Sequence, residues 1–142
     1  MEIPILYCLV SGSALTDLLR QKIFNKWLIT GACLGIVIAI FIPGPDLLWM
    51  KLMRVLITLL TLIPVYKVGG LGAGDIKLFM VIALFLSKEE LIAAIVVAFA
   101  IGAVLGIIKM LVNKSFGQTI HFALPIMISV LLVTNTHNLL SF

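Results

Sequence analysis

Long apolar stretches, separated by short polar or glycine-rich loops, make up nearly the whole sequence. A helix that crosses a bilayer needs about 20 apolar residues, with a range of roughly 17–25. We predict six helical segments close to this pattern: residues 3–19, 27–42, 47–66, 76–86, 91–112 and 120–140. The pattern is typical of an all-α, polytopic membrane protein, a bundle of about six transmembrane helices forming a single domain over residues 1–142.

Proline, glycine and charged clusters set the boundaries of these segments. The second segment is expected to stop at Pro43-Gly44-Pro45-Asp46, because this run of prolines and glycine does not continue a helix. We predict a turn at Ser87-Lys88-Glu89-Glu90 and an interruption of the sixth segment at Pro125.

The fourth segment, residues 76–86, is too short to cross a bilayer alone. Measured back from the predicted turn at Ser87, a helix rising about 1.5 Å per residue reaches only about 20 Å by Asp75. The hydrocarbon layer is about 30 Å thick, so Asp75 is expected below the membrane surface, after a glycine-rich, non-helical loop. Such backbone is tolerated at that depth only inside protein or beside water, which predicts a water-accessible pocket at Asp75.

The composition excludes a soluble domain. The chain of 142 residues is 63% hydrophobic and 11% charged, and its mean hydropathy is +1.29. A soluble domain of this size has no interior large enough to bury that much apolar surface. The net charge of +4 does not indicate binding to nucleic acid, because the basic residues are scattered through short loops.

The distribution of basic residues predicts the orientation, because such residues collect on the cytoplasmic side. One side of the predicted bundle collects Arg20, Lys22, Lys26, Lys67, Lys77, Lys109 and Lys114. We expect this side to face the cytoplasm, with Asp17 and Asp75 at the cytoplasmic ends of their helices and both termini outside. Lys51 and Arg54 are expected to extend their charged groups to the opposite membrane surface.

The sequence predicts neither a metal nor a cofactor. Cys8 and Cys33 lie in separate apolar segments without a CxxC spacing, and we interpret them as small core residues. His121 and His137 are far apart in the sequence, which contains neither an HExxH nor a GxSxG motif.

Two acidic side chains near the ends of apolar stretches carry the candidate chemistry. Asp17 lies near the end of the first stretch, and Asp75 precedes the fourth, within residues 69–78, GGLGAGDIKL. A carboxylate in hydrocarbon costs roughly 2.5–3.5 kcal/mol, so its presence indicates a function. We expect the two side chains to meet. Two close carboxylates share one proton, so that one activates water while the other protonates a leaving amine.

Each candidate residue also has a structural interpretation. Asp75 is a candidate helix N-cap, and Asp17 is a candidate cap or interfacial charge near Arg20. Lys77 is equally interpreted as an interfacial cation, and Arg20 and Asn25 as structural loop residues. Together, near the cytoplasmic ends of their segments, Asp17 and Asp75 are also a candidate pair for acid–base catalysis.

Two motifs resemble those of the type IV prepilin peptidases, which are membrane aspartic proteases. Residues 72–78, GAGDIKL, resemble the GxGD motif of that family. Residues 17–25, DLLRQKIFN, resemble its pattern of Asp, a basic residue and Ile-Pro-Asn, with Phe24 in place of the proline. The resemblance implies catalysis by Asp17 and Asp75. It also implies substrate-binding or supporting roles for Gly72, Gly74, Lys77, Arg20 and Asn25.

The chain lacks the extra cytoplasmic loop with paired cysteines found in larger family members, so it resembles the short, peptidase-only form. The resemblance implies an aspartic endopeptidase, without cofactor or metal, that removes the short basic leader from prepilin or pseudopilin precursors. It further implies a multi-pass protein of the inner (plasma) membrane with its active site toward the cytoplasm.

Other functions remain open at this point. A small ion-coupled transporter also uses intramembrane carboxylates, although both acids here lie toward one face and not at the midplane. A noncatalytic scaffold would keep its function without either aspartate. An intramembrane protease of the longer GxGD type pairs its motif with Tyr-Asp, whereas Thr16 precedes Asp17 in this chain.

Overall fold

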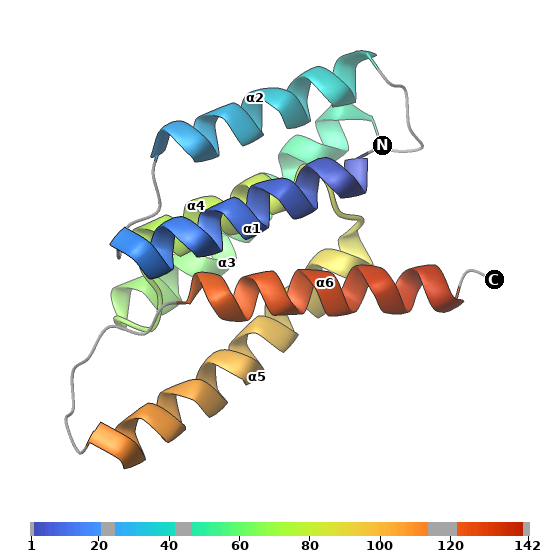
Figure 1. The fold of residues 1–142 in the computed structure, drawn as a ribbon. Helices are drawn as coiled ribbons and strands as arrows, with labels where there is room; N and C mark the ends of the chain where they lie inside the picture. Colours follow the sequence, from blue (N-terminus) through green and yellow to red (C-terminus); the bar gives the residue numbers. More distant parts are fainter. Residues whose placement is uncertain (1, 21–24, 42–46, 114–121, 141–142) are drawn as a thin grey trace.

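The structure, a computed structural model, describes residues 2–20, 25–41, 47–113 and 122–140 (Figure 1). Within these ranges it contains no strand and six helices: α1 (Glu2–Arg20), α2 (Asn25–Phe41), α3 (Leu48–Lys67), α4 (Ala73–Ile82), α5 (Lys88–Asn113) and α6 (Ala123–Leu140). The all-α class predicted from the apolar pattern is therefore confirmed.

Successive helices run in alternating directions through the bundle (Figure 1). α6 packs against α1 and α5, while α4 contacts α1, α2 and α3. The end of α1 and the beginnings of α2 and α4 consequently lie at the same end of the bundle (Figure 1). This topology brings together residues 17, 25 and 75, which are far apart in the sequence.

The short helix α4 lies at the centre of the hydrophobic core. Its buried residues are Asp75, Ile76, Leu78, Phe79, Val81 and Ile82. The core that includes Phe79 also contains Leu6 of α1, Leu62 of α3 and Ile126 of α6. Because apolar side chains on several sides enclose α4, the position of Asp75 in its first turn is fixed by core packing.

The outward faces of α2, α3 and α5 carry large exposed apolar side chains. Examples are Ile40, Trp49, Leu60, Val96 and Leu111. Soluble monomers rarely expose contiguous apolar surface on this scale, so the pattern favours contact with lipid.

Two of the described helices are long and apolar enough to cross a membrane. They are Leu48–Lys67 in α3 and Lys88–Ile108 in α5. Only 17% and 22%, respectively, of their most apolar stretch is buried inside the protein. A core helix of a soluble protein would be mostly buried. The apolar helices Ile3–Leu19, Asn25–Phe41 and Ala123–Thr136 are shorter, so six crossings stay a prediction.

The boundaries of α4 and α5 differ from those predicted. α4 begins at Ala73 and ends at Ile82, and residues 83–86 continue as hydrogen-bonded turns. α5 already begins at Lys88, because Ser87 and Glu90 form a capping box. The Ser87 amide and hydroxyl donate to the Glu90 carboxylate at 2.9 and 2.8 Å. The predicted turn over residues 88–90 is therefore the first turn of a helix.

The prediction for Pro125 is also wrong. This residue lies in the first turn of α6, where a proline removes no intrahelical hydrogen bond, so the helix is not interrupted there. The predicted stop at residues 43–46 lies outside the described residues, as do Ile120 and His121.

Of the two basic residues of α3, Lys51 differs from the prediction. Lys51 is only 5% exposed, so it does not extend to the membrane surface. The Arg54 guanidinium donates from Nη1 to the Leu86 carbonyl at 2.7 Å. This bond ties α3 to the turns that follow α4, and it satisfies a carbonyl that lies beyond the end of the short helix.

The connection between α3 and α4 is a tight, glycine-dependent turn. The Gly70 amide donates to the Val65 carbonyl at 3.0 Å, and the Gly69 amide donates to the Tyr66 carbonyl at 2.9 Å. These bonds form a Schellman motif, which requires a left-handed residue just after the helix. Gly69 has a φ of +80°, as that motif demands.

Gly69→Ala is expected to lower the free energy of unfolding by about 1–2 kcal/mol, because a Cβ is strained in the left-handed region. Gly69→Asn should lose less, since asparagine visits this region more readily. Thermal unfolding of the purified variants in detergent measures the difference. Equal losses in the two variants would contradict a conformational cause.

Candidate active site

Asp17 and Asp75 reach the candidate site from different helices. Asp17 lies one turn before the end of α1 and is 9% exposed. Asp75 lies in the first turn of α4 and is 8% exposed. The two helices are in contact. Two acidic side chains are thus withdrawn from solvent at the same end of the bundle.

The local structure around Asp75 explains how a carboxylate is held in the core. Gly72 is the N-cap of α4, and its amide donates to Oδ2 of Asp75 at 3.1 Å. Asp75 therefore occupies the N3 position, where an acidic side chain also interacts favourably with the helix dipole. Asp75 does contribute to capping, as the structural interpretation held, although from the N3 position and not as the N-cap.

Gly72 permits this contact for a steric reason. A Cβ built at position 72 would lie 3.0 Å from Oδ2 of Asp75, which is closer than most real Cβ contacts. A side chain here would push the carboxylate away from the Gly72 amide. The Gly72 amide was not predicted as a partner of Asp75, although the three-residue spacing between N-cap and N3 is a readable signal.

Burial withdraws the Asp75 carboxyl group from water, and the Gly72 amide replaces one of its lost contacts with solvent. Asp17 is also buried, near the end of α1, the helix that contacts α4. Two carboxyl groups held close together in such surroundings do not both ionise readily.

The other predicted site residues lie at different places relative to Asp75. Lys77 donates from Nζ to Oδ1 of Asn25 at 3.1 Å, and both side chains are exposed. At about 100° per residue, Lys77 lies roughly 200° around α4 from Asp75, so this pair occupies the opposite face. Gly74 is half-buried beside Asp75 in α4. Arg20 is the last residue of α1, and its side chain lies outside the described part of the structure.

The arrangement suits general acid–base chemistry. Two interacting carboxyl groups hold a shared proton, so one can accept a proton while the other donates one. Among the described residues, no group of three or more His, Cys, Asp or Glu side chains forms a metal site.

The sequence model of the type IV leader peptidase family matches residues 4–107. The matched region extends from α1 into α5 and includes Asp17 and Asp75. It covers well over half of the chain and confirms the family inferred from the two aspartate motifs. Among curated proteins and solved structures, no match was found.

Proposed function

Because the chain belongs to the type IV leader peptidase family, we propose that it is an aspartic endopeptidase that removes the short basic leader from prepilin-like precursors. One observation carries the aspartic mechanism. The buried carboxyl groups of Asp17 and Asp75 come from two different helices that contact each other, at the same end of the bundle.

The proposed reaction uses the two carboxyl groups and one water molecule. The ionised carboxylate accepts a proton from the water, whose oxygen forms a bond to the scissile carbonyl carbon. The protonated carboxyl group gives its proton to the amide nitrogen as the carbon–nitrogen bond breaks. The products are a new carboxyl group on the leader and a new N-terminal amine. Because the titration belongs to the pair, neither role is assigned to one aspartate.

The proposed substrate is a prepilin or pseudopilin precursor, in which a basic leader precedes a hydrophobic helix. A substrate helix in the membrane presents its cytoplasmic end at the depth proposed for Asp17 and Asp75. The exposed Lys26, at the start of α2, and the exposed Lys67, at the end of α3, lie at the same end of the bundle as these acids. Their positive charge supports a cytoplasmic orientation for that end. We therefore propose a multi-pass protein of the inner membrane, with both termini outside and the active site toward the cytoplasm.

The remaining residues of the site have proposed supporting roles. Gly72 positions Asp75 through its amide and through the absence of a Cβ. Gly74 keeps the first turn of α4 unobstructed beside the same carboxyl group. Lys77, Asn25 and Arg20 are proposed to support the cytoplasmic end of the bundle, where the precursor is expected to bind.

Asp17→Asn and Asp75→Asn are each expected to reduce precursor cleavage by about 10²–10⁴-fold, the usual contribution of acid–base catalysis. The test incubates purified protein in detergent with a prepilin precursor and identifies the new N-terminus by mass spectrometry. Glu89→Gln, at the opposite end of the bundle, is the control and should cleave as the wild type does.

Membrane insertion and thermal unfolding of each variant are compared with those of the wild type. Unchanged values establish that a loss of cleavage does not come from a loss of folding. Wild-type cleavage by either aspartate variant would overturn the paired mechanism. Proton-coupled solute flux that both aspartates require, without any cleavage, would identify an ion-coupled transporter instead.

A further inference from the structure

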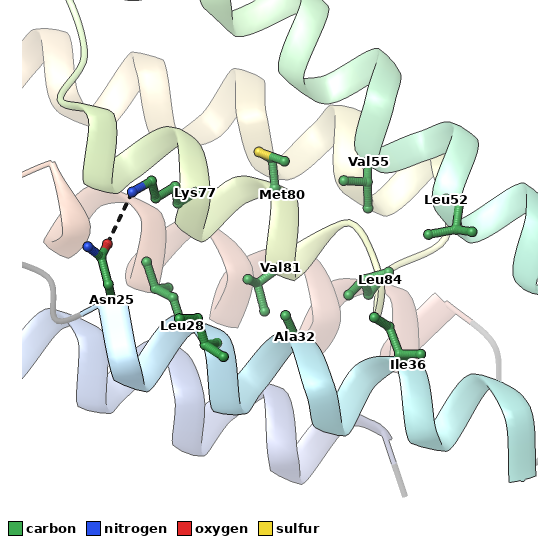
Figure 2. A pocket seen from close by; sticks show the side chains of 11 residues that line it. Asn25, Leu28, Ala32, Ile36, Leu52, Val55, Lys77, Met80, Val81 and Leu84 are labelled. Carbon is green, nitrogen blue, oxygen red and sulfur yellow. Dashed lines mark hydrogen bonds between the residues drawn. The ribbon is translucent and has the colours of Figure 1, made fainter.

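An apolar groove lies between α2, α3 and α4, with a volume of about 440 Å³ (Figure 2). Its walls include Leu28 and Ala32 of α2, Leu52 and Val55 of α3, and Met80 and Val81 of α4. Part of its rim is exposed, since Ile29 and Leu52 are 60% and 42% exposed. The groove is therefore open at the outer surface of the bundle, and its walls are apolar along most of its length.

The polar contacts of the groove are confined to one end. Figure 2 shows Lys77 and Asn25 at that end, joined by their hydrogen bond, and Ile36 and Leu52 at the other. A lysine ammonium has three N–H donors, of which Asn25 accepts one. The groove thus combines a long apolar wall with a terminal cation that can bind an anion.

The size of the groove indicates what fits in it. A helix about 10 Å across, advancing about 5.4 Å per turn, occupies roughly 400 Å³ for each turn. The groove accordingly accommodates about one turn of a helix, and a whole transmembrane segment would remain mostly outside it. A volume of this size is typical of sites for small ligands.

We propose that this groove binds one acyl chain of an anionic phospholipid, with the lipid phosphate against Lys77. The apolar walls match the chain, and the ammonium matches the charge of the headgroup. The polar end also lies at the end of the bundle proposed to face the cytoplasm, where a headgroup of that leaflet would be. This assignment rests on the proposed membrane location and not on the peptidase activity.

The experiment measures lipid retention by the full-length protein in detergent, using native mass spectrometry during titration with dioleoyl phosphatidylglycerol or dioleoyl phosphatidylcholine. The wild type should retain one phosphatidylglycerol with about tenfold preference, because the choline ammonium of phosphatidylcholine neutralises its headgroup and repels the Lys77 ammonium. Lys77→Gln should lose the preference. Lys67→Gln should keep it, because Lys67 is an exposed lysine at the end of α3 that does not line the groove.

A second pair of variants tests whether the apolar walls of the groove bind the acyl chain. Ala32→Phe fills the groove and should lower retention of both lipids about tenfold or more. Val37→Phe, on an exposed position of α2 that does not line the groove, should not change it. Leu52→Trp at the exposed rim provides a second blocking variant if Ala32→Phe fails to fold.

Equal retention of the two lipids by the wild type, or full retention by the folded blocking variants, would overturn the proposal. If the blocking variants retain lipid as the wild type does but show a raised KM for a prepilin precursor, the groove binds the precursor helix instead. That result would also overturn the lipid proposal. Asp17→Asn should bind lipid as the wild type does. The lipid measurement therefore remains valid even if the protein turns out not to be a peptidase. A protein that does not fractionate with membranes would refute the membrane location on which the assignment rests.

Discussion

The hydrogen bond from the Gly72 amide to Asp75 holds an acidic group inside an apolar core. Burial alone opposes ionisation of that group, and the first turn of a helix partly offsets the cost through its amide and dipole. Most residues of α4 after Asp75 are buried in the core, so the carboxyl group cannot withdraw without disturbing that packing. The proposed chemistry depends on this constraint, because it holds Asp75 at the end of the bundle where Asp17 also lies.

α4 separates two environments within one short helix. Asp75 lies on the face of α4 turned toward the core, whereas the opposite face carries Lys77 and a wall of the apolar groove. A ligand in the groove would therefore contact the helix that carries Asp75 without entering the space between the two aspartates proposed as the catalytic pair.

The sequence predicted the elements whose signals are local, and it failed where tertiary contacts decide. The spacing of apolar residues indicated six helices, and the two aspartate motifs indicated the family. The beginning of α5 was missed although Ser87 and Glu90 carry a readable capping pattern. The burial of Lys51 could not be predicted, because it follows from how α3 packs and not from its neighbours in the sequence. The meeting of Asp17 and Asp75 was expected because both acids lie near the ends of apolar segments, and the structure places them at the same end of the bundle. The groove depends on the spacing of three helices, which no single segment encodes.

The bond between Arg54 and the Leu86 carbonyl has a mechanical consequence for the pair of acids. With the Schellman motif before it and this guanidinium contact after it, α4 is attached to α3 on both sides. Sliding α4 along its axis would break contacts at both junctions together. The two junctions therefore fix the height of Asp75 relative to α3, so an axial shift of α4 is not a route by which the two carboxyl groups separate.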